Sequence, residues 1–241
     1  MRKLTRNLLR GAAAMALCGA AGMSHATPVT FDIVFLLDGS GSVGSTQFRS
    51  ERELINTIHD QFVALAPADH SVDYRFGVIE FSTIASVKQH LNTTYSASLV
   101  SNLSYVTGYS HLKDAVQGGL NLFTSEGSAS NIRQMFLFTD GLPNPSAQNP
   151  STLAPALDAA NVNVTVLGLQ DFNDVFVRSL VDDRARDEIL ATSYTAAKTE
   201  EINDRLLHPA PATAVPEPGS LALLLAGLGA AVPLVRRRRG I

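Results

Sequence analysis

Hydrophobic residues along this chain gather in short runs separated by polar turns, and the most apolar run covers residues 31–37. Six of these seven residues are apolar, which is typical of a strand buried on both faces of a parallel sheet. A more polar run at 85–91 follows a short turn and predicts an edge strand, paired as a hairpin with the strand before it. Further strands are expected from alternating or continuous apolar residues at 72–81, 131–139, 162–169 and 193–197.

Stretches with a helical period separate these runs. In residues 45–66 the apolar positions form one stripe on a 3.6-residue period, with Ser45 as the expected N-cap and Pro67 after the last turn. This stripe consists of Phe48, Ile55, Ile58, Phe62 and Leu65. A second stripe extends to Phe123 and has Ser110 in the expected N-cap position. Shorter helices are expected at 96–103, 155–161, 171–181 and 200–207.

The alternation of strands and helices sets the fold class. It predicts an α/β fold with a doubly wound, mostly parallel sheet flanked by helices and with one antiparallel edge strand. Right-handed crossovers place the loops that follow the parallel strands on one rim of the sheet. Ligands bind at this rim in open α/β sheets, so we expect functional residues in these loops.

Three loops expected on the rim carry hydroxyl and carboxyl groups. The first, Asp38-Gly39-Ser40-Gly41-Ser42, places three oxygen-bearing side chains directly after the most apolar strand. The others are Gly108-Tyr109-Ser110 and Thr139-Asp140-Gly141. Hard divalent cations such as Mg²⁺ take oxygen ligands, so the loops together predict a cation site. The alternative for the first loop is that Asp38 and Ser40 merely cap the following helix.

These loops resemble the metal-ion-dependent adhesion site of the von Willebrand factor type A (VWA) domain family. The segments 75–82 and 164–169 also resemble that family, and the resemblance covers about residues 30–207. It implies a Rossmann-like VWA fold that binds a divalent cation, Mg²⁺ or alternatively Mn²⁺ or Ca²⁺.

The resemblance also implies a role for each residue of the site. Ser40 and Ser42 would bind the metal directly through their hydroxyls, whereas Asp38 and Asp140 would hold it mainly through bound water. The threonine ligand of the family falls at Ser110, which keeps the hydroxyl but lacks the methyl group that restricts the rotamer.

Other loop residues are weaker candidates. Thr107 is the alternative to Ser110 as the third hydroxyl, although it lies three residues earlier. Tyr109, His111 and Asn144 flank the expected site and are candidates for ligand contact. Packing or solvent-facing roles are more common for loop residues of this kind.

The first 26 residues have the pattern of a secretory signal peptide. A basic start precedes a small, apolar stretch at 11–23, and Ser24-His25-Ala26 has the small-x-small pattern required for cleavage. The only cysteine, Cys18, lies in this segment, so the exported chain is expected to have no disulfide bond.

A second special segment lies at the C-terminus. Pro216-Glu217-Pro218 precedes an apolar stretch at 221–235, which is short for a membrane span of about 20 residues, and four arginines follow at 236–239. This order resembles the PEP-CTERM sorting signal. It implies that exosortase removes the tail after a transient stay in the inner membrane, and that the protein reaches the cell surface or exopolysaccharide matrix of a Gram-negative bacterium. A retained tail anchor is the alternative.

The expected segments are a signal peptide at 1–26, a VWA domain at 29–208, a linker with the Pro-Glu-Pro motif at 209–218, and a hydrophobic sorting segment with an arginine-rich end at 219–241.

Removal of the two end segments changes the charge. The whole chain has 19 basic and 22 acidic residues, a net charge of −3. Four basic residues lie in each end segment, so residues 27–218 retain 11 basic and 22 acidic residues, a net charge of −11. Such an acidic domain is a poor candidate for binding nucleic acid, because nucleic-acid binders carry a basic patch.

Two other classes of function compete with cation-dependent adhesion. An enzyme is disfavoured because the sequence has no Gly-x-x-x-x-Gly-Lys loop, His-Glu-x-x-His motif or nucleophile elbow, and a metal-dependent hydrolase needs more than two aspartates. A structural matrix protein with a vestigial metal site is the second alternative. We expect a non-enzymatic surface or matrix protein that binds an acidic-residue-bearing protein or a polysaccharide through its cation.

Overall fold

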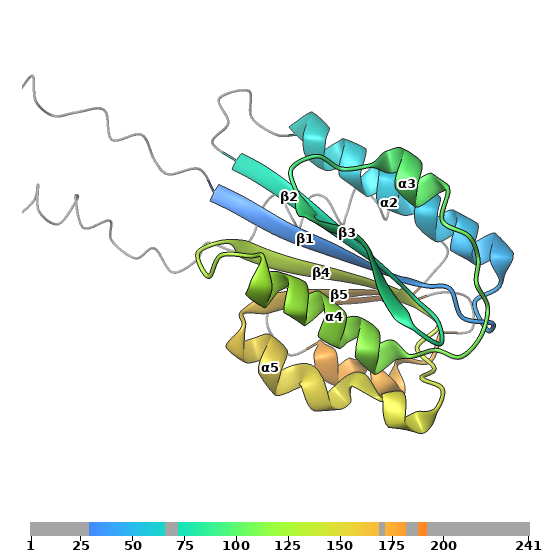
Figure 1. Ribbon diagram of the computed structural model, residues 1–241. Coiled ribbons are helices and arrows are strands. Elements are labelled where there is room, and N and C mark those ends of the chain that lie inside the picture. Colours follow the sequence, from blue (N-terminus) through green and yellow to red (C-terminus); the bar gives the residue numbers. More distant parts are fainter. Residues whose placement is uncertain (1–28, 66–71, 169–171, 182–187, 192–241) are drawn as a thin grey trace, which may run out of the picture.

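The computed structural model describes residues 29–65, 72–168, 172–181 and 188–191, which form a six-stranded sheet between two layers of helices (Figure 1). The strands lie in the order β3-β2-β1-β4-β5-β6. β2 and β3 pair antiparallel, and the other neighbouring strands pair parallel. The strands are β1 Val29–Asp38, β2 Val72–Phe81, β3 Ala85–Asn92, β4 Ile132–Thr139, β5 Val162–Gly168 and β6 Glu188–Ala191. The expected mostly parallel α/β sheet with one antiparallel edge strand is confirmed.

β1 lies at the switch point of this sheet. After β1 the chain adds β2 and β3 on one side, then crosses over to add β4, β5 and β6 on the other side. Asp38 at the end of β1 is in register with Phe81 of β2, and Leu37 is in register with Phe138 of β4. The loops after β1 and β4 therefore leave the same edge of the sheet side by side, at the position where open α/β sheets bind ligands.

Helices cover both faces of the sheet. The helices α2 (Ser45–Leu65) and α3 (Ala97–Ser101) lie over one face, and α4 (Leu112–Ser125) and α5 (Ala154–Ala159) lie over the other (Figure 1). Successive side chains of a strand point to opposite faces, so those of β1 enter both layers. Phe35 packs in the α2 layer and stacks on Phe136 of β4, with ring centroids 5.5 Å apart.

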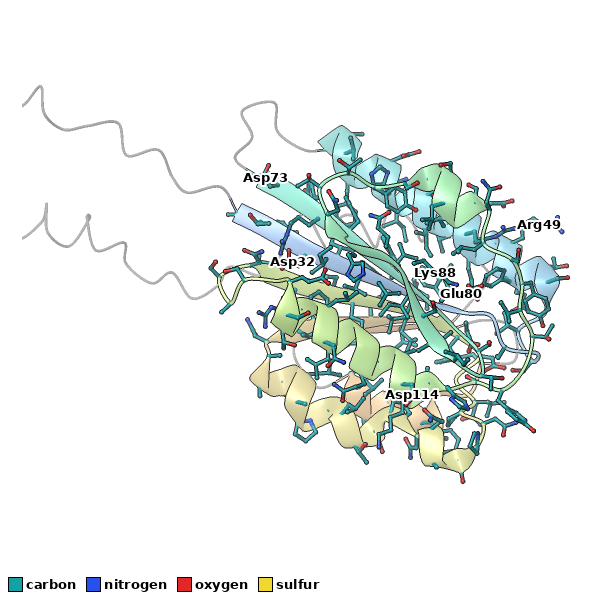
Figure 2. All side chains as sticks on the ribbon, in the orientation of Figure 1. Asp32, Arg49, Asp73, Glu80, Lys88 and Asp114 are labelled. Carbon is teal, nitrogen blue, oxygen red and sulfur yellow. The ribbon has the colours of Figure 1, made fainter. Side chains whose placement is uncertain are left out.

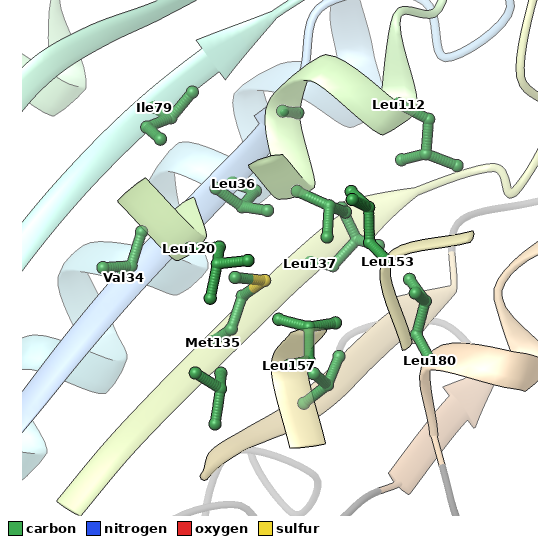
Figure 3. Packing of buried hydrophobic residues seen from close by; sticks show 14 of the residues in the cluster. Val34, Leu36, Ile79, Leu112, Leu120, Met135, Leu137, Leu153, Leu157 and Leu180 are labelled. Carbon is green, nitrogen blue, oxygen red and sulfur yellow. The ribbon is translucent and has the colours of Figure 1, made fainter. Parts of the chain in front are cut away.

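The α4 layer is built mainly from aliphatic side chains of the central strands and the two helices (Figure 3), together with Phe81 and Phe123. Leu36 of β1 and Met135 of β4 pack with Leu120 of α4 and Leu157 of α5. All four side chains are buried. Burial of the central strands on both faces explains why residues 31–37 form an almost continuous apolar run.

Asp32 is the one polar residue of that run, and it is fully buried near the start of β1. Its Oδ1 accepts hydrogen bonds from Arg75 of β2, at 2.8 Å from Nε and 2.6 Å from Nη2, and its Oδ2 accepts one at 3.0 Å from Asn131. Figure 2 shows Asp32 at the opposite end of the sheet from Asp114, which lies near the rim loops. The carboxylate thus joins three segments at the edge remote from the predicted site.

The N-cap residues of α2 and α4 are not the two serines expected from the sequence. The carbonyl of Gly44 accepts the Phe48 amide at 3.1 Å, so Gly44 rather than Ser45 is the N-cap of α2. His111 rather than Ser110 is the N-cap of α4, because its carbonyl accepts the Ala115 amide at 3.1 Å. The Ser110 hydroxyl is therefore available for another partner.

The predicted helix at 171–181 is wrong for the described residues. The chain forms two 3₁₀ turns instead, η3 (Asp174–Phe176) and η4 (Arg178–Leu180). Asn173 starts the first turn by accepting the Val175 amide at 3.1 Å through its side chain. β-Branched valines, which have low helix propensity, disfavour a continuous α-helix here. Two further 3₁₀ helices, η1 (Ser146–Gln148) and η2 (Pro150–Leu153), precede α5.

The remaining sequence expectations fall beyond the described ranges. Outside the described residues lie the expected strand at 193–197, the expected helix at 200–207 and both end segments. The structure also contains a strand, β6, that was not expected from the sequence. Within the described residues, no helix combines the length and apolar character needed to cross a membrane.

Candidate metal centre

Backbone hydrogen bonds hold the three rim loops together. The Gly39 amide donates to the Phe81 carbonyl at 2.7 Å, which fixes the first loop to the end of β2. The Gly41 amide donates to the Gly108 carbonyl at 3.0 Å and joins the first loop to the second. The Asn144 amide donates to the Ser110 carbonyl at 3.0 Å and joins the third loop to the second. The loops predicted to share one rim therefore form a single unit.

Asp38 is the centre of this unit, and its carboxylate is fully buried. Its Oδ1 accepts the Ser40 amide at 3.0 Å within the first loop. Its Oδ2 accepts the Ser110 hydroxyl at 3.3 Å from the second loop and the Thr139 hydroxyl at 2.7 Å from the end of β4. One carboxylate thus gathers polar groups from all three loops.

The two serines of the first loop face each other across 3.2 Å between their Oγ atoms. Ser40 is buried, whereas Ser42 is exposed on the solvent side. Asp140 is also buried, and its Oδ1 accepts the Leu142 amide at 3.1 Å. The five residues predicted from the sequence therefore lie on loops that the structure brings together, with an open side at Ser42.

Thr139 is a residue of this unit to which the sequence assigned no role. Besides donating to Asp38, its hydroxyl accepts the Gly141 amide at 3.0 Å. It is fully buried at the last position of β4. Its place directly before Asp140, at the end of an apolar strand, is the sequence signal that identifies it.

Two glycines permit the loop conformations. Gly108 has a φ of +108°, and a Cβ added there would lie 2.4 Å from Thr83 Oγ1. Gly141 has a φ of +80°, and its Cβ would lie 2.0 Å from the Asn173 carbonyl oxygen. Any larger residue at either position would displace its neighbours and the loop.

The structure distinguishes the two candidates for the third hydroxyl group and shows where the three flanking residues lie. Ser110 contacts Asp38, whereas Thr107 is exposed. His111 places its Nδ1 3.2 Å from Asp114 Oδ2 at the start of α4. The Tyr109 side chain is exposed while its amide donates to Thr83 Oγ1 at 3.1 Å, and the exposed Asn144 contributes its amide to the loop contact above.

Glu51 is a second residue missed by the sequence interpretation. It lies on α2 and is fully buried, and neither carboxyl oxygen has a hydrogen-bond partner among the described residues. The predicted apolar stripe jumps seven residues, from Phe48 to Ile55. Glu51 occupies the position between them, where helical periodicity expects a core-facing side chain.

The electrostatic environment of these acids is unfavourable without a cation. Burial raises the pKa of Asp38 to about 6, against hydrogen bonds from Ser40 and Thr139 that lower it. Burial also raises the pKa of Glu51 well above its usual range, and the charges of Asp38 and Asp140 raise it further. Within the described part of the chain, no lysine or arginine forms an ion pair with any of these three residues.

The donor set fits a hydrated divalent cation. The groups gathered here are hydroxyl and carboxylate oxygens, which suit Mg²⁺, Mn²⁺ or Ca²⁺. The described residues contain no group of three or more His, Cys, Asp or Glu placed to hold an ion by themselves. An ion would therefore depend on the serine hydroxyls and on water, and its positive charge would offset the buried carboxylates.

The fold and these loops define a doubly wound α/β domain with a candidate cation site at the switch point of its sheet. Residues 32–205 match the von Willebrand factor type A domain, and the chain belongs to this family. Residues 214–239 match the PEP-CTERM protein-sorting motif. Both family resemblances stated from the sequence are confirmed.

Curated relatives include large animal proteins. The chain is 27% identical over 173 residues to the collagen alpha-1(VI) chain of Homo sapiens, covering 65% of this chain and 16% of that one. It is 25% identical over 145 residues to integrin alpha-X of Mus musculus, covering 57% of this chain and 12% of the relative. The chain thus spans a small part of these relatives.

Solved structures share the fold. Manganese-loaded TRAP protein of Plasmodium vivax has a TM-score of 0.53 at 21% identity, covering 73% of this chain and 71% of that chain. Proximal thread matrix protein 1 from the mussel byssus, with a zinc-occupied MIDAS motif, has a TM-score of 0.57 at 16% identity. The match covers 75% of this chain and 46% of that chain. Both structures share the fold of this chain, and their bound metals are properties of those proteins.

Proposed function

We propose that this protein is an exported adhesion or matrix protein whose VWA domain binds a protein or polysaccharide ligand through a divalent cation. The observation that carries the proposal is the buried Asp38 carboxylate, which gathers hydroxyl groups from Ser110 and Thr139 and the amide of Ser40. Membership of the family, with collagen VI and integrin chains as relatives, supports a ligand-binding adhesion domain.

Each residue of the site has a defined task in this proposal. Ser40, Ser42 and Ser110 present hydroxyl oxygens to the ion, which is Mg²⁺ or alternatively Mn²⁺ or Ca²⁺. Asp38 and Asp140 hold it mainly through bound water. When bound, the cation would supply a coordination position that a carboxylate oxygen of the partner takes in exchange for water. Neutral hydroxyls leave the ion able to attract that acidic group, and the exposed Ser42 marks the side of approach.

The location follows from the two end segments. The sorting motif indicates an exported protein of a Gram-negative bacterium that is processed at its C-terminus. We propose that residues 1–26 direct export, that exosortase removes the tail near Pro216-Glu217-Pro218, and that the domain is released to the cell surface or exopolysaccharide matrix. The membrane is then involved only before processing.

A cation titration tests the site. Thermal unfolding of the exported protein, purified from its host, is followed in chelator and in millimolar Mg²⁺, Mn²⁺ or Ca²⁺. A bound ion raises the unfolding midpoint by mass action, and a concentration of about 100 times Kd corresponds to ~2.7 kcal/mol. Asp38→Ala and Ser40→Ala should abolish the rise. No rise in the parent protein would instead favour a structural matrix protein with a vestigial site.

A further inference from the structure

Glu51 stands out because a carboxyl group occupies the apolar stripe of α2. The neighbouring positions of the stripe, Phe48 and Ile55, are buried in the sheet-facing core. Glu51 is equally buried, yet both of its carboxyl oxygens lack partners among the described residues. A buried carboxyl group without a hydrogen bond costs stability, so this position calls for a partner that the described part of the chain does not supply.

The other buried acid beside the first loop provides a contrast. Glu80 of β2 lies 3.0 Å from the Lys88 ammonium through its Oε2, and Figure 2 shows the two side chains together. A Cβ built on Gly39 would lie 3.7 Å from Glu80 Oε1, so Glu80 also borders the loop. Among the described residues, one carboxyl oxygen of Glu80 therefore has a cationic partner, whereas neither oxygen of Glu51 has one.

The packing of α2 under the first loop places Glu51 beneath the candidate cation site. Phe48, three residues earlier on the same face of α2, lies 3.6 Å from a Cβ added to Gly39 of that loop. The charges of Asp38 and Asp140 raise the pKa of the Glu51 carboxyl group. The Asp38 backbone amide approaches this group and lowers its pKa, but no donor among the described residues forms a hydrogen bond of normal geometry with it. These three acids do not form a group that holds an ion directly within the described residues. Glu51 is therefore suited to contact an ion through water rather than as a ligand.

We propose that Glu51 is a positioning residue of the cation site, whose carboxyl oxygens accept hydrogen bonds from water molecules bound to the ion. This inference rests on the proposed function, since it requires that a cation binds at Asp38. Groups that hold the ligands of a metal commonly change its affinity 10- to 100-fold when they are altered. Glu51 thereby links cation binding to the packing of α2 on the sheet.

Two opposite effects distinguish this role from simple packing. In chelator, Glu51→Met should raise the unfolding midpoint, because it removes the unpaired buried polar atoms, whereas Glu51→Gln keeps an unpaired amide in their place. In the presence of Mn²⁺, the same substitutions should weaken binding about 10- to 100-fold. A purely structural residue would instead shift the midpoint by the same amount in both conditions.

The test measures Mn²⁺ affinity by calorimetry and bound-ion hydration by paramagnetic water relaxation, on the exported protein. The matched controls are Glu53→Gln, exposed on the same helix, and Asp32→Asn, buried and paired with Arg75 at the edge of the sheet remote from the site. Both should leave Mn²⁺ affinity within about twofold of the parent value. Glu51→Met provides the measurement if Glu51→Gln does not fold.

The outcomes separate this inference from the proposed function. If the parent binds Mn²⁺ and the Glu51 variants bind it equally well, the inference is overturned and the proposed function stands. If the parent binds no divalent cation, both are overturned. Weakened binding together with a raised midpoint in chelator supports the role of Glu51.

Discussion

The hydroxyl of Thr139 donates a 2.7 Å hydrogen bond to Oδ2 of Asp38, so two buried side chains join the ends of β4 and β1 at the switch point of the sheet. The same hydroxyl accepts the Gly141 amide at 3.0 Å. Thr139 therefore fixes the third loop and orients the central carboxylate at once.

Thr139→Val removes this hydroxyl and keeps the shape of the side chain. It leaves a buried carboxylate oxygen and the Gly141 amide each short of one partner, so we expect a loss of about 1–3 kcal/mol in the free energy of unfolding. Cation affinity should fall with it, because Asp38 loses its orientation. Urea unfolding and calorimetric titration with Mg²⁺ measure the two effects.

The control is Thr165→Val on β5, where Thr165 Oγ1 accepts a 2.9 Å hydrogen bond from Gln134. This variant loses a buried hydrogen bond elsewhere in the sheet and should bind the cation as the parent does. Equal affinities for the two variants and the parent would show that Thr139 does not orient the site.

Stability should depend on pH through Asp38. Burial raises the pKa of this carboxyl group from 3.8 to about 6. The folded protein therefore holds a proton that the unfolded chain releases, so the free energy of unfolding in chelator should increase as the pH falls from about 6 to about 4, by up to ~3 kcal/mol. Above this window the contribution is constant.

Denaturant titrations at pH 4–7 in chelator test this slope. Asp38→Asn removes one titrating group and should reduce the slope relative to the parent, with the remainder due to Glu51, whose pKa is also raised, while Asp60→Asn, on the exposed side of α2, should leave the slope unchanged. The cation favours the ionised carboxylate, so its affinity should decrease over the same fall in pH. An unchanged slope in Asp38→Asn would assign the pH dependence to other groups.

The fold and the first loop were predictable because their signals are local. Asp38, Ser40 and Ser42 lie within five residues at the end of a buried strand. The carboxyl ends of parallel strands lie at the same edge of a sheet, so the position of this loop is determined by the strand. Ser110 stays a predicted ligand, and the structure places its hydroxyl on Asp38, whereas its expected role as an N-cap was wrong. A serine hydroxyl can either cap a helix or donate a hydrogen bond to a carboxylate such as that of Asp38. The sequence does not distinguish these two roles, because the choice depends on the path of the folded chain.

Glu51 and β6 were missed for different reasons. A periodicity analysis treats an acidic residue in an apolar stripe as a gap. The significance of Glu51 depends on its burial and on the charge of Asp38, which comes from another part of the chain. β6 has four residues that follow a charged stretch, so neither length nor alternation marks it as a strand. Its pairing with β5 is a property of the assembled sheet.

The prediction that Ser110 takes the place of the family's threonine ligand has a measurable consequence. Ser110→Ala removes the hydroxyl that donates to Asp38, and should weaken Mg²⁺ binding at least tenfold. Ser110→Thr keeps the hydroxyl and restricts its rotamer, so its affinity should equal or exceed that of the parent. Calorimetry measures both. Tighter binding by Ser110→Ala than by the parent would exclude this hydroxyl as a ligand.

The conformation of the second loop depends on Gly108. Gly108→Ala combines a φ of +108° with a Cβ only 2.4 Å from Thr83 Oγ1, so we expect about 1–3 kcal/mol of destabilisation and weaker cation binding. Gly44→Ala is the matched control, because Gly44 has a φ of +81° but nothing within 4 Å of an added Cβ. It should lose less stability and keep its cation affinity. Chemical unfolding and Mg²⁺ titration compare the two, and equal affinity losses would contradict a role for the Gly108 contact.

Replacement of Pro216-Glu217-Pro218 by alanines should leave the protein in the inner membrane. The motif match covers residues 214–239, and the substitution removes its leading element while keeping the apolar stretch at 221–235 and the four arginines that follow. An unprocessed tail of this length and charge order can act as an anchor, since basic residues remain on the cytoplasmic side. Fractionation of host cells, with antibodies against the VWA domain, measures the distribution.

The control is the double substitution Pro209→Ala and Pro211→Ala, which lies outside the matched motif and should leave release unchanged. Release of both variants to the same extent as the parent would mean that the Pro-Glu-Pro element does not direct processing, and the tail would then act by its hydrophobicity and charge alone.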